Sequence, residues 1–385
     1  MSNSLAEVGN SIRVENGFAF SSRFFCGSEQ GLPLVRIRDI DARTTEVNFS
    51  GPFHPKYLLS DGDVIIGMDG DFRVSRWQGG LALLNQRVCR VTADQKRLDQ
   101  DFLFHALQPH LDRVHRSTPQ TTVRHLSERG IRSLKIPHFS LGEQRKIGEI
   151  LDAMDEQIRS TSRVIAKLEL VKEASLTHLL SQINPDLGSF GSVCESSAFG
   201  PRFSSDNYGE FGELAMLRTT DLDQEGNMRL HTMPRIALSP ASFLSHLLIP
   251  KDLLISRSGT CGIASVFPGY EVPVIPGAFL IRFRLHVPDL STFYRRYFNS
   301  SLGRPFLDRL AVGGVQKNLK GSEILRMLVP IPSLADVVKI EDAMTGIEDD
   351  IANEKGVLEK IRIMKQGLQA DLLMGQVRVP AEVSS

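Results

Sequence analysis

The chain has 385 residues, of which 41% are hydrophobic and 23% charged, and its formal net charge is zero. This length and composition predict a soluble globular protein with two or three domains. No run of about 18 apolar residues is present, and the N-terminus lacks the pattern of a secretory signal, which excludes a membrane span and argues against secretion. The four cysteines lie far apart without a CxxC motif, so we expect reduced thiols in a cytoplasm and no zinc site.

The charge is distributed unevenly along the chain. Basic residues exceed acidic ones by three in residues 1–140 and by two in residues 183–333, whereas acidic residues exceed basic ones by four in residues 334–385. A zero net charge argues against nucleic acid as a partner. The two mildly basic blocks nevertheless give weak support for DNA binding within them.

The first half of the chain predicts a mixed α/β domain followed by a long helix. Short apolar runs at 64–66 and 81–84, separated by Gly, Pro and Asp, are typical of strands, and a short helix is expected near 101–108. Residues 1–139 therefore form the first predicted domain. A helix over 140–184 follows, with Ser140 as its N-cap and an acid three residues later, as in a capping box.

The second half repeats this organisation. Apolar runs at 253–255 and 279–283 predict strands, and a short helix is expected near 290–300. The second predicted domain covers residues 185–332. It is followed by a helix over 333–377, with Ser333 as a plausible N-cap, and by a tail over 378–385.

The two halves are an internal repeat. The segment that begins at Leu126 matches, without a gap, the segment that begins 193 residues later at Leu319. Phe102 and Phe293 occupy similar settings, although the blocks before the matched segments are only loosely alike. We interpret the matched segments as shared architecture and the divergent blocks as surfaces for two different targets.

Both long helices carry a coiled-coil seam, in which apolar residues recur at alternating steps of four and three. The seam residues are Ile147, Leu151, Met154, Ile158, Ile165, Leu168, Ile340, Met344, Ile347, Ile351, Leu358, Ile361, Leu368 and Leu372. Two core helices of an ordinary bundle are the alternative. The repeat predicts that the seams pair antiparallel but leaves their register open. If Ile165 faces Ile361, Lys172 falls opposite Glu354 and Thr161 opposite Lys365, and this is the register that we predict.

The sequence lacks the motifs of common enzymes that act on DNA. It contains no GxxxxGK[ST] phosphate loop, no Asn/Asp-Pro-Pro-Tyr methyltransferase motif, no HExxH and no GxSxG. The ten histidines are scattered and suggest no metal site. A binding module is therefore favoured over an enzyme.

Two segments are the leading candidates for DNA contact. Residues 113–125 carry three arginines, two histidines and no acid, and residues 313–320 are their counterpart. Arg and Lys neutralise phosphates, while Arg, Asn and Gln pair with base edges. Loops 67–77 and 256–262 follow matched strands and add further candidates. The predicted DNA-binding residues are Arg36, Arg73, Arg76, Arg113, Arg116, Gln120, Arg124, Arg218, Arg257, Ser258, Gln316, Lys317, Asn318 and Lys320.

These features together resemble the specificity subunits of type I restriction–modification systems. The resemblance is carried by the duplication, by the two coils and by segments 67–72, 84–89, 136–147, 256–260 and 329–334. The second copy departs from the pattern, because the Glu143-Gln144 pair becomes Asp336-Val337. This change weakens the expected symmetry at that helix start.

The resemblance implies an α+β fold of two similar target recognition domains separated by an antiparallel coiled coil. Each domain would read half of a bipartite, asymmetric site in double-stranded DNA. The coil would dock two modification subunits, and restriction subunits would join the complex. S-adenosylmethionine, ATP and magnesium are expected on those partners only, and this chain would need no cofactor or metal. The predicted partner-binding residues are Glu143, Gln144, Arg145 and Asp336.

Two other functions remain open from the sequence. The chain could be a free-standing enzyme acting on DNA through an unfamiliar site, which cleavage or methylation by the purified chain would reveal. It could also be an adaptor whose two domains bind proteins, which a failure of both domains to bind DNA would favour.

Overall fold

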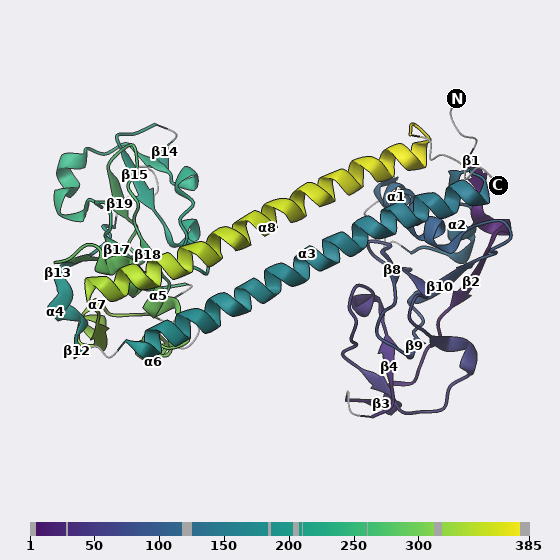
Figure 1. The fold of residues 1–385 in the computed structure, drawn as a ribbon, viewed down its shortest axis with the longest axis horizontal. Coiled ribbons are helices and arrows are strands. Elements are labelled where there is room, and N and C mark those ends of the chain that lie inside the picture. The colour runs from purple at the N-terminus through teal and green to yellow at the C-terminus, as the bar shows by residue number, and fades with distance from the viewer. Residues whose placement is uncertain are drawn as a thin grey trace. The chain divides into compact units, whose positions relative to one another are not determined.

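The computed structural model describes residues 5–27, 30–117, 125–183, 186–202, 208–209, 211–259, 261–311 and 318–377. The chain divides into two compact units, of which the first comprises residues 1–162 and 356–385 and the second residues 163–355. Each unit contains one globular domain with parts of the two long helices α3 (Leu141–Gln182) and α8 (Leu334–Met374) (Figure 1).

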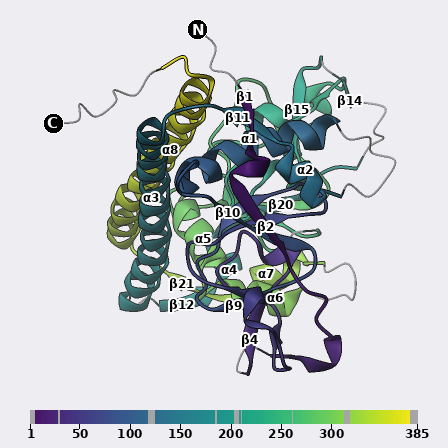
Figure 2. The ribbon, with the colours of Figure 1, turned by 90° about the vertical axis from the view of Figure 1, so that its right-hand side faces the viewer.

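Among the described residues, the domain of the first unit contains three sheets. The central sheet has the order β2–β10–β7–β8, with strands Ile12–Asn16, Val88–Ala93, Val64–Gly67 and Val74–Arg76. A second sheet has the order β3–β5–β4–β9–β6, with strands Phe25–Cys26, Asn48–Phe49, Leu32–Val35, Ala82–Leu84 and Leu58–Leu59. The antiparallel pair β1 (Leu5–Glu7) and β11 (Lys135–Pro137) lies beside helix α1 (Gln100–Ser117), as Figure 2 shows. Helix α2 (Glu128–Arg132) precedes β11.

The domain of the second unit has a similar arrangement, but its second sheet has no counterpart of β6 among the described residues. Its central sheet has the order β13–β20–β17–β18, with strands Cys194–Phe199, Leu280–Leu285, Leu253–Ser256 and Ala264–Val266. A second sheet, β14–β16–β15–β19, has strands Tyr208–Gly209, Arg235–Ile236, Leu214–Leu217 and Val274–Pro276. The antiparallel pair is β12 (Asp186–Ser189) with β21 (Leu328–Ile331). The helices are α4 (Phe190–Val193), α5 (Leu290–Asn299), α6 (Arg304–Leu310) and α7 (Gly321–Leu325).

A repeated ion pair supports the duplication at the level of single residues. In the first domain, Arg90 on β10 donates a hydrogen bond to Asp63 at 3.1 Å and another to a backbone oxygen of residue 58. In the second domain, Arg284 on β20 makes the equivalent bonds to Asp252 at 2.8 Å and to a backbone oxygen of residue 247. The predicted fold class, two similar α/β domains with two long helices, is confirmed.

The ends of both long helices belong to the domain cores. In the first unit, Leu151 of α3 and Leu372 of α8 are buried together with Phe102 of α1. In the second unit, Leu176 of α3 and Met344 of α8 are buried in a core that also contains Phe293. The two helices run in opposite directions within each unit (Figure 1). Their ends bury apolar surface in the domain core, and this burial stabilises the packing of the domain on both helices.

Both helices begin with a capping box. The Ser140 hydroxyl accepts a hydrogen bond from the Glu143 backbone N–H, and the Glu143 carboxylate accepts one from the Ser140 N–H at 2.9 Å. Asp336 makes the same reciprocal contacts with Ser333. The shorter acid therefore preserves the cap, and the loss of symmetry expected from the Asp336 substitution does not occur at this position.

The predicted register of the two seams needs a correction. Lys172 lies 3.4 Å from Glu348, not opposite Glu354, and Lys365 contacts Asp155 rather than Thr161. Both partners are six residues from the predicted ones. The prediction considered only residues of the two helices, whereas Glu348 and Asp155 also contact side chains of the globular domains.

Two smaller features bear on the candidate sites. Helix α1 runs to Ser117, so the first part of the basic segment at 113–125 is helical rather than a loop. Trp77, in the candidate loop 67–77, is completely buried, and its indole N–H donates to the Gly80 oxygen at 2.6 Å, so this side chain packs inside the domain. Within the described ranges, every helix is too short or too polar to cross a membrane.

Candidate nucleic-acid interface

A corner with the same backbone hydrogen bonds lies at one end of each central sheet. In the first domain, the Leu126 N–H donates to the Met68 oxygen at 2.7 Å, and the Met68 N–H donates to the Arg87 oxygen at 3.0 Å. Each bond joins the loop after β7 to another segment of the chain. Three loops therefore meet at one place.

The second domain repeats this corner. The Leu319 N–H donates to the Arg257 oxygen at 3.0 Å, and the Arg257 N–H donates to the Phe279 oxygen at 2.8 Å. Leu319 is the repeat partner of Leu126, and Arg257 follows β17 as Met68 follows β7. The two domains therefore hold three equivalent loops in the same arrangement.

The side chains of the first corner are Asp69, Arg87 and His125. Asp69 pairs with the Arg87 guanidinium, and one of its oxygens lies 2.7 Å from His125 Nδ1. The Arg87 and His125 side chains are 56% and 54% exposed. The ion pair holds the arginine in place while leaving much of it accessible, which reduces the entropy lost when it binds another group.

The side chains of the second corner are Arg257, Phe279 and Asn318. Arg257 Nε donates to Asn318 Oδ1 at 3.1 Å, and its guanidinium lies 4.6 Å from the centre of the Phe199 ring. Phe279 and Phe199 are exposed. Asn318 is the repeat partner of His125, so equivalent positions carry chemically different groups.

These groups are suited to reading bases. Arginine pairs with guanine and asparagine pairs with adenine in the major groove. Exposed aromatic rings make apolar contacts with thymine methyl groups or stack on bases. The two corners therefore offer different recognition chemistry on one backbone frame.

The sequence identified the second corner better than the first. Arg257 and Asn318 were among the predicted residues, whereas Asp69, Arg87 and Phe279 were not. The signal that could have found them is the repeat itself, applied to the residues around Arg257 and Asn318. The sequences of the two domains match only loosely outside the ungapped repeat, so these equivalent positions could not be aligned from the sequence.

Two predicted DNA-binding arginines have structural partners. Arg36 donates to Asp39, and its guanidinium also reaches Glu46 at 2.8 Å. Arg218 makes the equivalent contact to Asp221 at 2.8 Å, and this hydrogen bonding raises the pKa of Arg218. Each pair closes a turn after a strand of the second sheet, β4 or β15, which favours a role in folding.

Two other predicted arginines, one in the loop after β7 and one at the end of β8, are also paired. Arg73 is 61% exposed and binds Asp41 at 2.6 Å. Arg76 is only 17% exposed and binds Asp152 of α3 at 2.6 Å and Asp101 of α1 at 2.8 Å. Arg76 thus joins its domain to the long helix.

The remaining predicted DNA-binding residues fall into three groups. Arg113 and Arg116 are exposed on α1, without an ion pair to any other described residue. Ser258 is half-buried beside Arg257, and Lys320 is exposed and pairs with Glu323 at 3.1 Å. Outside the described residues lie Gln120, Arg124, Gln316 and Lys317.

The predicted partner-binding residues have unequal exposure. Glu143 and Asp336 are half-buried and cap their helices. Gln144 is only 5% exposed, donates to the Phe139 oxygen at 2.9 Å and accepts from the Asp99 N–H at 2.8 Å. Arg145 is exposed, so its side chain is the most accessible to a partner protein among these four residues.

A second surface is repeated on the long helices. Three exposed apolar side chains of α3 recur 193 residues later on α8. The α3 residues are Val164, Leu170 and Val171, with exposures of 40%, 71% and 49%, and the α8 residues are Val357, Ile363 and Met364, with exposures of 42%, 60% and 63%. We call these two sets the apolar triplets. Exposed apolar side chains at equivalent places on both helices are candidates for contact with a partner.

Comparison with known proteins gives one consistent family. The sequence model of the type I restriction modification DNA specificity domain matches residues 5–170. The specificity subunit of the type I restriction enzyme EcoBI from Escherichia coli is 38% identical over 160 residues. That match covers 42% of this chain and only 33% of the E. coli protein.

More distant relatives extend the similarity over most of the chain. The specificity subunit of the type I restriction enzyme MjaVIII from Methanocaldococcus jannaschii is 18% identical over 356 residues, covering 84% of this chain and 80% of that protein. The S subunit of the M. genitalium type I restriction-modification system has a similar fold, with a TM-score of 0.60, 13% identity and 96% coverage of both chains. A chain from a structure on assembly and conformational transition of the type I R-M system has a TM-score of 0.62, 16% identity and 98% coverage of both chains.

Proposed function

We propose that the chain is a type I restriction–modification specificity subunit, because residues 5–170 match the model of the type I DNA specificity domain and the E. coli specificity subunit is 38% identical over 160 residues. Its two globular domains would then read the two halves of a bipartite DNA site. The site would be asymmetric and double-stranded, with an unread segment between the halves. The long helices would hold the domains and dock the other subunits of the complex.

The observation that carries this proposal is the pair of corners. The same backbone hydrogen bonds present Arg87 and His125 in the first domain and Arg257 and Asn318 in the second. Equivalent loops with different exposed side chains are what two readers of different sequences require, because base identity is read by side-chain chemistry at groove edges.

The structural contacts divide the predicted DNA-binding residues by role. Arg113, Arg116, Arg257, Ser258, Asn318 and Lys320 remain candidates for DNA contact, and Arg73 joins them through its exposure. Gln120, Arg124, Gln316 and Lys317 stay in the proposal on sequence grounds. Ion pairing within the domains favours a structural role for Arg36, Arg76 and Arg218.

We assign no catalytic step to this chain. Specificity subunits are the DNA-recognition components of their systems, so methylation, ATP hydrolysis and cleavage would belong to the modification and restriction subunits. S-adenosylmethionine, ATP and magnesium would then be bound by those partners. This function places the chain in the cytoplasm, together with the DNA it reads.

The apolar triplets support docking of two copies of one partner. Their members are related by the repeat, and Val164 and Val171, like Val357 and Met364, are seven residues apart and so lie on one helix face. Two equivalent surfaces match two modification subunits. Arg145, exposed at the start of α3, adds a polar contact to this proposed interface.

The experiment uses the full chain with its modification subunits and a pool of DNA duplexes randomised at both half-sites. Arg87→Ala is expected to relax base preference in one half-site, and Arg257→Ala in the other, each costing about 1–3 kcal/mol at one position. Arg97→Ala is the control, since Arg97 is 63% exposed and pairs with nearby Asp94 away from the corner.

The outcomes separate the competing functions. A variant that changes both half-sites, or neither, contradicts reading at the corners. DNA binding by neither domain in the complete complex would favour a protein-binding adaptor. Methylation or cleavage by the purified chain alone would identify it as an enzyme.

A further inference from the structure

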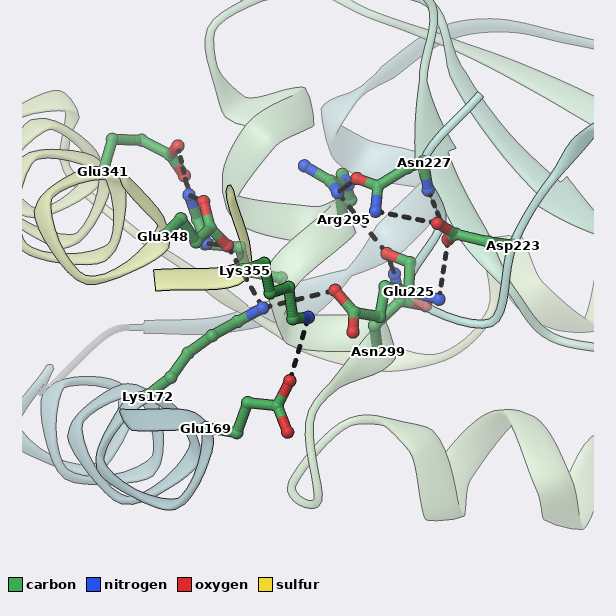
Figure 3. Close-up of polar contacts among 11 residues, drawn as sticks. Glu169, Lys172, Asp223, Glu225, Asn227, Arg295, Asn299, Glu341, Glu348 and Lys355 are labelled. Carbon is green, nitrogen blue, oxygen red and sulfur yellow. Dashed lines mark hydrogen bonds and ion pairs between the residues drawn. The ribbon is translucent and has the colours of Figure 1, made fainter. Parts of the chain in front are cut away.

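A polar network connects the domain of the second unit with both long helices, and Lys172 lies at its centre (Figure 3). The Lys172 ammonium, on α3, is 3.4 Å from the Glu348 carboxylate of α8. It is also 3.4 Å from the carboxylate of Glu225, in a loop of the globular domain. One cation therefore contacts both the other helix and the domain.

Glu348 is shared with a buried arginine of the same domain. Arg296 on α5 is 7% exposed and binds Glu341 at 2.8 Å and Glu348 at 2.9 Å. A buried guanidinium requires such partners, because an unpaired charge in the interior is strongly unfavourable. Glu348 thus receives one cation from the domain and one from α3.

The loop that carries Glu225 is fixed to the rest of the domain. Asp223 accepts hydrogen bonds from the backbone N–H groups of Glu225 and Asn227, at 2.9 and 2.8 Å. Arg295 of α5 donates to Asn227 Oδ1 at 2.7 Å, and Asn299 donates to the Glu225 oxygen at 3.2 Å (Figure 3). Lys172 therefore contacts a loop whose backbone is hydrogen-bonded to the rest of the domain.

The first unit contains the repeat counterpart of this network. Lys365 of α8, 193 residues after Lys172, binds Asp155 of α3, 193 residues before Glu348. Asp155 lies 3.9 Å from His105 Nδ1, and His105 occupies a place on α1 similar to that of Arg296 on α5. In both units a lysine of one long helix pairs with an acid of the other, and that acid also contacts a helix of the domain, α1 in the first unit and α5 in the second.

The network of the first unit includes three residues of types that can bind a metal ion. His105, Asp152 and Asp155 bring their ligand-type atoms within 4.8 Å of one another. Arg76 binds Asp152 at 2.6 Å, and Lys365 binds Asp155. Two protein cations thus neutralise the carboxylates, which gives the group a role in joining helices to the domain.

From the two networks we infer that Lys172 and Lys365 are positioning residues, each of which fixes the orientation of its domain on the two long helices. The inference rests on the proposed function and adds a consequence to it. A domain held in one orientation accepts its half-site at one distance from the other, whereas a domain free to tilt accepts a shift of one base pair, about 3.4 Å along the duplex. The lysines would therefore determine how strictly the length of the unread segment is read.

The test measures methylation by the complete complex on duplexes with the native unread segment or with one base pair more or fewer. Lys172→Met keeps the aliphatic stem and removes the charge. We expect the preference for the native length to fall by about tenfold, which corresponds to about 1.4 kcal/mol. Base preference within each half-site should not change, whereas a general loss of folding would reduce it. Lys172→Arg should retain the native preference.

Lys355→Met is the matched control. Lys355 of α8 also pairs with an acid of α3, Glu169, at 3.0 Å, but this pair is 54% and 51% exposed. Its contacts involve only the two helices, as far as the described contacts go. The control variant should keep both the length preference and the base preference of the wild type.

A second variant keeps the test decisive if Lys172→Met fails to fold. Glu225→Gln changes a side chain that is 62% exposed and removes only the contact from the domain to Lys172. It should also weaken the length preference. An unchanged length preference in Glu225→Gln, or in a folded Lys172→Met, overturns the inference. Failure of the wild-type complex to methylate any duplex with two half-sites would instead contradict the proposed function.

Discussion

At the scale of single residues, two residues at equivalent positions of the repeat can have different chemical roles. Gln144 and Val337 are repeat partners, and both are buried, yet one locks its helix through hydrogen bonds and the other through apolar packing. His105 and Arg296 likewise occupy similar places with different side chains. The repeat conserves burial and direction more closely than residue type, because backbone packing tolerates different side chains of suitable size.

Replacing Gln144 with alanine should lower the free energy of unfolding by about 1–3 kcal/mol, because the Asp99 N–H loses its acceptor and the Phe139 oxygen loses its donor. Chemical denaturation of the full chain measures this change. Arg145→Ala is the control at the neighbouring exposed position, and it should stay within about 0.5 kcal/mol of the wild type. Equal stability of the two variants would show that the buried amide contributes little.

The Glu348 carboxylate should make stability depend on pH in the acid range. Burial alone would raise the pKa of Glu348, but hydrogen bonds and charge from Arg296 and Lys172 outweigh it and hold the pKa below its ordinary value of 4.5. A lowered pKa in the folded state contributes stability that is complete above about pH 4.5 and is lost as the pH falls through the folded value.

Glu348→Gln should therefore show a shallower loss of stability below pH 4.5 than the wild type. At neutral pH it should be less stable by about 1.5–3 kcal/mol, since Arg296 loses one charged acceptor. Unfolding curves between pH 3 and 7 measure both effects. Glu359→Gln, at an exposed position of the same helix, should follow the wild-type pH profile.

At the scale of elements, each long helix contributes residues to both domain cores and also carries exposed apolar residues. Their ends are buried in the two cores, their caps are reciprocal Ser–acid pairs, and the apolar triplets face outward. Seam residues at the helix ends pack against the globular domains, so the contacts of the two helices are not set by helix–helix pairing alone. This is the reason that the heptad pattern alone gave the wrong partners for Lys172 and Lys365.

The apolar triplets predict a stepwise change in partner stoichiometry. If two modification subunits dock as we propose, Leu170→Glu should remove one of them, Ile363→Glu should remove the other, and the double variant should bind neither, because a charge in an apolar contact remains desolvated and unpaired. Mass measurement of the assembled complex by light scattering tests this. Leu187→Glu is the control, since Leu187 is 67% exposed on strand β12 rather than on a long helix. Two bound subunits in the double variant would exclude the triplets as the docking surface.

At the scale of the whole molecule, the duplication predicts independent recognition by the two domains. Exchanging residues 1–139 for the matching domain of a relative should change one half-site and leave the other unaltered, because each domain has its own core and its own corner. Methylation mapping in cells that carry the exchanged gene reads both halves at once. A change in both half-sites would contradict independent recognition.

The sequence by itself determined the duplication, the two long helices with their serine caps, and the separation into two domains of one fold. These features depend on local signals, namely heptad spacing, cap residues and a match between segments 193 residues apart. Such signals act over a few turns of chain or over an ungapped alignment, so they can be read without coordinates.

Only the tertiary structure decided which charged residues are engaged and which are available. Arg36, Arg76 and Arg218 were predicted to bind DNA together with Arg257, yet acids bind each of the first three within the fold. The corner residue Arg87 and the shared contacts of Lys172 were likewise not evident from the chain order. Ion pairs join residues far apart in sequence, and their partners are chosen by packing of whole elements rather than by any local pattern.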